Sequence, residues 1–431
     1  MERGTRADVP ASPWWTYRDG RLACDGASLE AVAAAHGTPT FVYAAGAIDA
    51  AYDALEAAVP KPCLIAYAIK ANSNLAILGR LARRGCGADI VSGGELRRCL
   101  EAGVDPKKIV FSGVGKTDAE LAMALDAGIR ALHVESVPEI DAIEALARSR
   151  GQKAPITLRV NPNVDPKTHP YIATGLHDTK FGLELDVARE LLPRLVTSEH
   201  LALEGVACHV GSQLSSAEPM ADATEILGAF AVECVKAGAR LRSIDAGGGW
   251  PIRYGDEDLD YAPWDAFGAA IRQGLRASGA DQLGLELIVE PGRALVGDAG
   301  GLLTRVVFVK EQHGKRFVVV DAAMTELIRP ALYDAYHAVM PVLEAPPGET
   351  ADLVGPVCET GDFFALDRAL PPLARGDLVL LRGAGAYGMS MASQYNSRPL
   401  AAEILVEGAD VQVIRRRQSY EDLWREEARP G

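Results

Sequence analysis

Two residues in the first three hundred could together activate a carbonyl compound. Lys70 directly follows an apolar run, and a lysine removed from water becomes less basic and more nucleophilic toward carbonyl groups. Glu290 also ends an apolar run, and a buried carboxylate can keep a pyridine nitrogen protonated, which makes the ring an electron sink. The competing interpretations are a solvated lysine at the first position and a structural ion pair at the second.

A histidine and three consecutive glycines add groups suited to an aromatic, phosphorylated ligand. Gly247, Gly248 and Gly249 have no Cβ atoms, so their N–H groups can converge on an anion, although a tight turn would also use them. His209 closes another apolar run, where its ring could lie flat against a cofactor or simply belong to the core. Ser212 follows closely and offers a further hydrogen-bond donor.

Arginine and tyrosine side chains further along the chain suit an anionic ligand. Arg293 offers a planar fork for a carboxylate or a phosphate. Arg329 and Tyr333 are four residues apart, so one helical turn would direct both toward the same ligand. Ordinary surface spacing is the alternative for this pair.

A thiol and a carboxylate stand side by side in a segment framed by glycine and proline. Cys358 could deliver a proton, and Glu359 could hold a substrate ammonium group. A lone cysteine is usually inert core, but a core position beside a glutamate in a loop is unusual. The glycine-rich loop 383–388 adds one phenol, Tyr387.

Alternating strand and helix patterns provide a scaffold for these groups. Eight short apolar runs alternate with longer helical segments, which predicts parallel βαβ units. Eight such units indicate a β/α barrel of the TIM type. A doubly wound open sheet is the alternative, but the first strand is not followed by a glycine-rich phosphate loop. The strands are expected at 62–68, 88–91, 108–112, 130–134, 155–161, 204–210, 241–245 and 285–290, with helices between them and one before the first, at 47–58.

The residue just past each expected strand is polar or glycine. In a barrel these positions share the rim that carries the chemistry. A lysine, a histidine, a triple glycine and a glutamate on one rim form a specific combination. The rim positions are Lys70, Ser92, Ser112, Glu135, Asn161, His209, Gly247 and Glu290.

The pattern changes after about residue 300, where short strand-like runs have connections rich in glycine and proline. Residues 13–43 also look strand-like and are expected to join them. The sequence therefore predicts a barrel domain at 40–300 and a mostly β second domain formed by 1–39 and 301–431.

Composition narrows the function further. Acidic residues number 58 and basic residues 44, which gives a formal charge of −14 and argues against a nucleic-acid or membrane-surface partner. The seven cysteines include no C-x-x-C pair, so neither a disulfide framework nor a metal site is expected. No signal peptide or membrane span is expected, which favours a cytoplasmic location.

Taken together, the motifs resemble those of the pyridoxal-phosphate-dependent decarboxylases of the alanine racemase fold. Tyr67–Asn72 is similar to the lysine motif of this family, and the resemblance covers about residues 40 to 400. The other matching runs are Val91–Leu96, Thr168–Gly175, Lys180–Gly182, His209–Gln213, Gly247–Gly249, Glu290–Arg293, Arg329–Tyr333, Cys358–Asp362 and the Tyr387 loop.

The resemblance implies a barrel of the alanine racemase type and a role for each residue. Lys70 would bind pyridoxal 5′-phosphate covalently, His209 would stack on its ring and Glu290 would pair with the ring nitrogen. The phosphate end of the cofactor would be bound by Gly247, Gly248, Gly249, Arg293 and Tyr387, and Ser212 is expected as a further cofactor-binding residue. The substrate would be held by Arg293, Arg329, Tyr333, Glu359 and Tyr387, and Cys358 of a partner subunit would return a proton to the reacting carbon.

Within this family the expected reaction is decarboxylation of meso-2,6-diaminopimelate to L-lysine and CO₂, the last step of one route of lysine biosynthesis. The distal end of that substrate carries a carboxylate and an ammonium group, which suit an arginine and Glu359. A homodimer with shared active sites is also implied. The alternatives are a related decarboxylase of arginine, ornithine or carboxynorspermidine, and a non-catalytic cofactor-binding homologue or a racemase.

Overall fold

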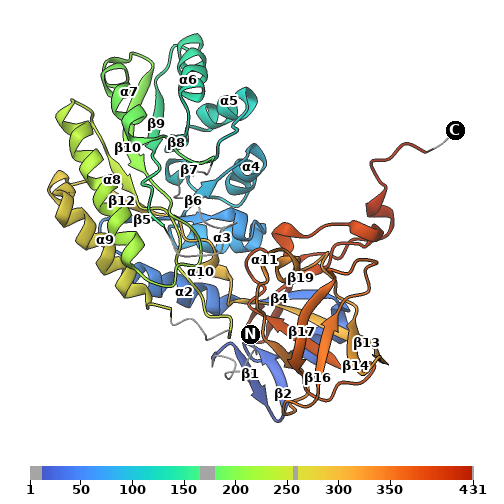
Figure 1. Ribbon diagram of the computed structural model, residues 1–431. Coiled ribbons are helices and arrows are strands. Elements are labelled where there is room, and N and C mark those ends of the chain that lie inside the picture. Colours follow the sequence, from blue (N-terminus) through green and yellow to red (C-terminus); the bar gives the residue numbers. More distant parts are fainter. Residues whose placement is uncertain (1–11, 166–179, 256–260, 430–431) are drawn as a thin grey trace. The chain divides into compact units, whose positions relative to one another are not determined.

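The computed structural model describes residues 12–165, 180–255 and 261–429, which form two compact units (Figure 1). The barrel unit comprises Tyr52–Pro251 and Asp260–Gly292, within the described ranges. The β unit comprises Met1–Ala51, Ile252–Leu259 and Arg293–Gly431, again within those ranges. The motif Thr168–Gly175 of the sequence analysis lies outside the described residues.

Eight parallel strands close into a barrel, in agreement with the sequence prediction, and the open-sheet alternative is wrong. Neighbouring strands run in the order β10-β11-β12-β5-β6-β7-β8-β9, so the first and last strands of the series pair with each other around the ring. All carboxyl ends therefore meet at one rim. The strands are β5 (Cys63–Ala68), β6 (Gly87–Ile90), β7 (Ile109–Phe111), β8 (Ala131–Val134), β9 (Ala154–Arg159), β10 (Leu201–Ala207), β11 (Ser243–Asp245) and β12 (Glu286–Val289).

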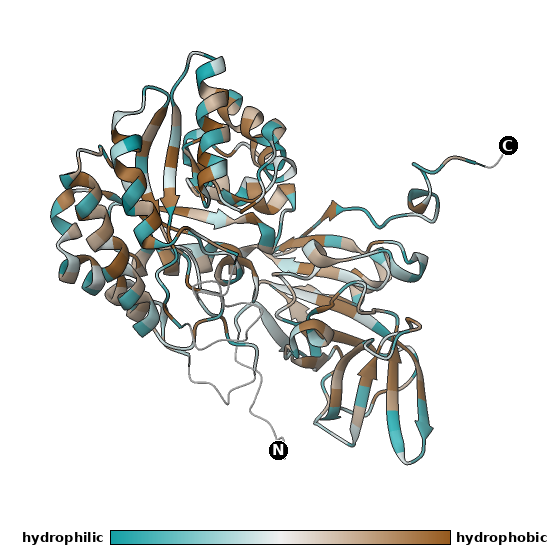
Figure 2. Ribbon diagram, turned by 45° about the horizontal axis from the view of Figure 1, so that its top comes forward, coloured by the Kyte–Doolittle hydropathy of each residue, from teal (hydrophilic) through white to brown (hydrophobic). Residues whose placement is uncertain are grey.

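Helices connect consecutive barrel strands, as the alternating pattern predicts. Figure 2 shows brown segments on the strands and brown and teal bands along the helices, as expected when each helix buries one face. The helices are α2 (Ala45–Ala58), α3 (Leu75–Arg83), α4 (Gly93–Glu101), α5 (Asp118–Ala127), α6 (Val137–Ser149), α7 (Leu185–Thr197), α8 (Glu218–Lys236) and α9 (Trp264–Ser278), with 3₁₀ turns η1 (Ile69–Ala71), η2 (Pro106–Lys108) and η4 (Ala280–Leu283).

The sequence marks the ends of several helices by capping. Thr117 and Glu120 form a reciprocal capping box at the start of α5, and Gly128 ends the helix in the left-handed conformation. The cap of α3 is Asn74, whose side chain accepts from the N–H of Ala76. Such caps satisfy N–H groups that no helical carbonyl can reach.

An apolar cluster forms part of the barrel core. Leu64, Ala66, Val110 and Ile288 form a buried cluster contributed by β5, β7 and β12. Strands buried on both faces read as nearly continuous apolar runs, which is why the sequence pattern located them within a few residues.

The β unit contains a nine-stranded sheet with the order β17-β16-β14-β13-β4-β19-β20, in which β18 pairs with both β13 and β15. The strand β4 lies between β13, its antiparallel neighbour, and β19, its parallel neighbour. The elements are β4 (Thr40–Ala44), α10 (Arg293–Val296), β13 (Gly300–Gln312), β14 (Lys315–Val320), α11 (Arg329–Tyr333), β15 (Val339–Pro341), β16 (Thr350–Val354), β17 (Phe363–Ala369), β18 (Leu378–Arg382), η5 (Met389–Met391), η6 (Tyr395–Ser397), β19 (Ala402–Glu407), β20 (Asp410–Arg415) and η7 (Glu421–Leu423).

The N-terminal part also differs in detail from the sequence pattern. Three short strands form a separate sheet, β1 (Trp15–Arg18), β2 (Arg21–Cys24) and β3 (Ala27–Ser28), followed by helix α1 (Leu29–His36), which the strand-like interpretation of 13–43 missed. The expected boundary at residue 40 assigns β4 to the barrel domain, whereas β4 pairs inside the β unit. The sequence could not decide this, because a buried apolar strand has the same residue pattern in the barrel and in the sheet of the β unit.

No helix among the described residues combines the length and apolarity needed to cross a bilayer.

Candidate active site

Lys70 lies in η1, directly after β5, and pairs with a carboxylate inside the barrel. Its Nζ atom is 3.2 Å from Oδ2 of Asp89, whose side chain is completely buried on β6. Burial opposes ionisation of Asp89, but the Lys70 ammonium and the Ser112 hydroxyl together hold the pKa of Asp89 below its usual value. The charged pair fixes the lysine amine at the rim.

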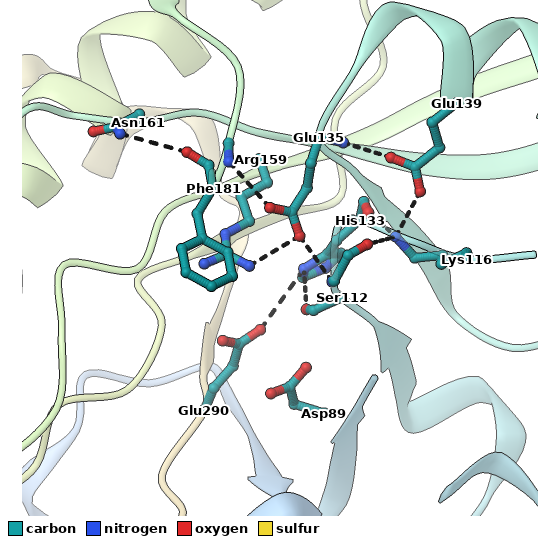
Figure 3. A network of polar contacts seen from close by, with 12 residues as sticks. Asp89, Ser112, Lys116, His133, Glu135, Glu139, Arg159, Asn161, Phe181 and Glu290 are labelled. Atoms are coloured by element: carbon teal, nitrogen blue, oxygen red, sulfur yellow. Dashed lines mark hydrogen bonds and ion pairs between the residues drawn. The ribbon is translucent and has the colours of Figure 1, made fainter. Parts of the chain in front are cut away.

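A buried histidine lies near Asp89 in the barrel interior (Figure 3). His133 comes from β8, and its Nδ1 atom lies 3.2 Å from the Ser112 hydroxyl. Burial lowers the pKa of His133 to about 3, so the imidazole is neutral at physiological pH. Its Nε2 atom is buried without a hydrogen-bond partner among the described residues. A neutral ring with one unsatisfied nitrogen indicates a site that is completed by a ligand or a proton.

Two carboxyl groups converge on His133. Oε1 of Glu290 lies 3.7 Å from Nδ1, and Oδ2 of Asp245 lies 3.9 Å from Nε2. Burial raises the pKa of Asp245 to about 7, and burial together with the charges of Asp245 and Asp89 raises that of Glu290. The three side chains could also provide metal ligands, because these atoms lie within 4.8 Å of one another. The raised pKa values of Asp245 and Glu290 favour a proton shared between these two carboxyl groups.

The proton that Asp245 and Glu290 share should make the stability of the cofactor-free protein depend on pH. A carboxyl group whose pKa rises on folding binds more protons in the native state, so stability falls as pH rises through that interval. We expect the free energy of unfolding to decrease between about pH 4 and pH 7, with a slope of at most about 1.4 kcal/mol per pH unit for one proton. Asp245→Asn should flatten this slope, measured by urea unfolding across the interval.

The exposed Asp281 provides the matched control for this experiment. Asp281→Asn removes a carboxylate without changing the barrel interior, so its slope should equal that of the parent protein. Equal slopes for Asp245→Asn and the parent protein would contradict the shared proton.

His209 and the triple glycine hold each other in place. The N–H of Gly248 donates to Nδ1 of His209 at 2.9 Å, so the proton of the neutral ring must be on Nε2. Desolvation and the nearby Lys70 ammonium lower the pKa of His209 to about 3, which keeps the ring neutral. A neutral, oriented imidazole is suited to stacking on an aromatic ring.

Backbone carbonyl oxygens approach Gly247 and Gly248 so closely that no side chain fits at either position. A Cβ atom on Gly247 would lie 2.5 Å from the carbonyl oxygen of Cys208, and one on Gly248 would lie 2.5 Å from that of Glu290. The N–H of Gly247 donates to Asp245, and that of Gly248 to His209. Among the three, only the Gly249 N–H lacks an acceptor within the described residues. The anion-binding hypothesis therefore depends mainly on Gly249.

A second polar network stiffens the rim beside the histidine (Figure 3). Glu135 accepts hydrogen bonds from the N–H groups of Gly113 and Gly182 and from Arg159, whose guanidinium lies over the Phe181 ring. Lys116, in turn, donates to Glu139 and to the carbonyl oxygen of His133. Side chains with several buried partners hold β8 and β9 in fixed positions.

The β unit contains a separate group of cationic and aromatic side chains. Arg293, at the start of α10, is buried, and its Nη1 atom donates to the Tyr254 hydroxyl at 2.6 Å. The same guanidinium lies 4.9 Å from the centre of the Tyr387 ring. Tyr387 has a φ of 57°, in the left-handed region, so the backbone is strained to present this phenol.

Arg329 lies next to this pair. The residue begins α11, is buried, and has its guanidinium 4.8 Å from the centre of the Tyr254 ring. Its Nη1 atom lies 2.9 Å from Nε2 of His337. Among the described residues, no carboxylate lies within ion-pair distance of Arg329. A buried guanidinium whose partners are neutral is suited to bind an anionic ligand.

Tyr333 and Arg329 both belong to α11, so the predicted helical turn is confirmed. Cys358 and Glu359 are exposed, and the N–H of Cys358 donates to Oδ1 of Asn396. The described chain includes all seven cysteines, and Cys358 is the only one of them that is exposed. An accessible thiol is what proton delivery requires.

Five of these residues are not singled out by any motif in the sequence. Asp89 and His133 are single polar residues within short apolar strands, and Asp245 ends a third short strand. The contrast with apolar neighbours is the signal that could have found them. Tyr254 and His337 carry no such signal, because each lies in a loop, where polar and aromatic residues are common.

The barrel unit fits a pyridoxal cofactor. It presents a lysine amine at the rim, a neutral histidine for stacking, and a buried carboxyl group with a raised pKa at Glu290. Residues 45–297 match the model of the pyridoxal-dependent decarboxylase family, pyridoxal binding domain. The chain belongs to this family.

Within the family, several relatives have the same name. The diaminopimelate decarboxylase of Pseudomonas aeruginosa is 48% identical over 95% of this chain and 97% of its own length. A crystal structure of diaminopimelate decarboxylase from Helicobacter pylori complexed with L-lysine is 43% identical, with a TM-score of 0.88, and covers 92% of this chain and 98% of that chain. A structure of diaminopimelate decarboxylase from M. jannaschii in co-complex with L-lysine has a TM-score of 0.91 at 37% identity and covers 97% and 98%.

Proposed function

We propose that the protein is a carboxy-lyase that converts meso-2,6-diaminopimelate to L-lysine and CO₂ with pyridoxal 5′-phosphate as cofactor. The relatives that share nearly the full chain have this name, and two of them are described with L-lysine. The observation that carries the proposal is the buried Arg329, which has only neutral partners among the described residues. A diamino diacid provides the carboxylate that this guanidinium needs.

The barrel unit holds the reacting groups. Lys70 attaches the cofactor, and Asp89 holds the lysine amine at the rim between turnovers. When bound, the cofactor withdraws the electron pair that the departing CO₂ leaves behind. Glu290 would pair with the ring nitrogen of the cofactor, and its raised pKa would make a proton available at that atom.

The neutral His209 would stack on the cofactor ring without adding a positive charge beside the Lys70 amine. The Gly249 N–H and Ser212 of the barrel unit would bind the cofactor phosphate, and Arg293 and Tyr387 of the β unit would be its further donors. Because the N–H groups of Gly247 and Gly248 already donate to Asp245 and His209, these two glycines contribute shape and not donors.

The β unit recognises the distal end of the substrate. Arg329 and Tyr333 bind its carboxylate, and Glu359 binds its ammonium group. An ornithine-like substrate, and the diamine formed from it, has no distal carboxylate. Because of this, its binding would leave the Arg329 charge buried without compensation. This favours diaminopimelate over ornithine, arginine and carboxynorspermidine.

Cys358 returns the proton to the reacting carbon, and it does so in the active site of a second subunit. Its exposure supports this role, because a thiol that serves a partner must be accessible on its own chain. The functional unit is a homodimer with shared sites, and we place it in the cytoplasm, where free thiols persist.

The decisive assay is lysine formation from meso-diaminopimelate, with and without added pyridoxal 5′-phosphate. We expect CO₂ and L-lysine in equal amounts, and a loss of both when the cofactor is removed. Arginine, ornithine and carboxynorspermidine serve as the control panel. Faster turnover of any of these than of diaminopimelate would reject the assigned substrate.

A further inference from the structure

His337 hydrogen-bonds through both ring nitrogens, and its partners determine which nitrogen carries the proton. Nδ1 lies 2.9 Å from the carbonyl oxygen of Arg382, and Nε2 lies 2.9 Å from Nη1 of Arg329. A carbonyl oxygen can only accept, and a guanidinium can only donate. The proton must therefore be on Nδ1, and Nε2 must accept from Arg329. The ring is neutral and has a single tautomer.

The surroundings keep this ring neutral. His337 is fully buried, and burial together with the Arg329 charge lowers its pKa well below 6.5. The titratable and charged groups that face it come from several elements of the β unit. They are Arg329 of α11, Tyr254 with its ring edge-on at 5.4 Å, Arg293 of α10, Arg368 of β17, which donates to the His337 carbonyl, and Arg382 of β18, which pairs with Asp298.

A neutral acceptor has a specific advantage at this position. It fixes the plane of the Arg329 guanidinium through one hydrogen bond but leaves the positive charge uncompensated. A carboxylate there would orient the guanidinium equally well and would also neutralise it, so it would compete with a carboxylate of the ligand. The imidazole therefore orients the Arg329 guanidinium without neutralising its charge.

We propose that His337 is a positioning residue for carboxylate recognition, which orients Arg329 as a neutral hydrogen-bond acceptor and preserves its charge for the ligand. This rests on the proposed function, because it assumes that Arg329 binds the distal carboxylate of diaminopimelate. Tyr254 supports the same arrangement, since its ring contacts both Arg329 and Arg293.

Two amide variants separate the two hydrogen bonds of His337. In His337→Gln the side-chain oxygen can reach the position of Nε2 and accept from Arg329. In His337→Asn the shorter amide places its N–H near the position of Nδ1, where it can donate to the Arg382 carbonyl. His337→Glu keeps an acceptor for Arg329 but adds a negative charge.

The readouts are KM and kcat for meso-diaminopimelate, together with the dissociation constants of L-lysine and of 1,5-diaminopentane for the holoenzyme. L-lysine keeps the distal carboxylate, and 1,5-diaminopentane lacks it. We expect His337→Asn and His337→Glu to raise KM and the L-lysine dissociation constant about tenfold or more. Their kcat and their affinity for 1,5-diaminopentane should change little. His337→Gln should remain within a few-fold of the parent protein.

The opposite pattern overturns the proposal. If His337→Asn kept the parent KM and L-lysine affinity while His337→Gln lost them, His337 would only anchor its segment to the Arg382 carbonyl. A double-mutant cycle gives a second test, because His337→Asn should have no further effect on L-lysine binding in an Arg329→Gln background. An additive effect there contradicts the proposal. Failure of the parent protein to form lysine would instead reject the proposed function.

Discussion

Lys70→Ala is expected to abolish the visible absorption of the holoenzyme and to reduce turnover by at least on the order of a thousandfold. The absorption requires a covalent bond between the cofactor and an amine, and among the barrel-rim positions only Lys70 provides one. The substitution also leaves Asp89 buried without the ammonium group that stabilises its charge.

Lys70→Arg separates these two effects. An arginine keeps a positive charge near Asp89 but has no amine that condenses with a carbonyl group. Both variants should lose the absorption band, whereas only the alanine variant should raise the pKa of Asp89 and lower the melting temperature near neutral pH. A holoenzyme that keeps its band and its turnover after Lys70→Ala would disprove the assignment.

Mixing two inactive variants should restore activity. If Cys358 serves the active site of the partner subunit, a dimer of one Lys70→Ala chain and one Cys358→Ala chain contains one site with both native residues. Random reassociation of equal amounts makes half of the dimers mixed, so about a quarter of the parent activity should return. The measurement is lysine formation after dissociation, mixing and reassociation.

A mixture of Cys358→Ala and Glu359→Gln chains is the matched control. The two residues are adjacent, so both reach the same site from one chain, and in a mixed dimer each site still lacks one of them. No recovery is expected from this mixture. Shared active sites would be contradicted if the control mixture regained activity. They would also be contradicted if the mixture of Lys70→Ala and Cys358→Ala chains stayed inactive.

The fold was predictable where local pattern and burial agree. Parallel strands covered on both sides are continuous apolar runs, and the helices between them carry clear start and stop residues such as Thr117 and Gly128. Pattern could not decide which sheet β4 joins, because its pairing with β13 and β19 depends on residues more than two hundred positions away. The short, alanine-rich α1 was also missed.

The candidate site was predictable at the rim and not below it. Lys70, His209 and Glu290 stand at strand ends, where a barrel places its chemistry, so position alone selected them. Asp89, His133 and Asp245 come from β6, β8 and β11, which are not neighbours in the ring. Their convergence follows from closure of the barrel, which brings together side chains that no sequence spacing connects.

Along the described residues the chain passes between its two units four times: at 51/52, at 251/252, between 255 and 261, and at 292/293. No single cut can therefore release either unit as one continuous piece. The barrel cannot be exchanged for another by one recombination event at a linker, and neither unit can be completed on the ribosome before synthesis of the other has begun. The two units must therefore be inherited together and synthesised together, although each has its own β-structure.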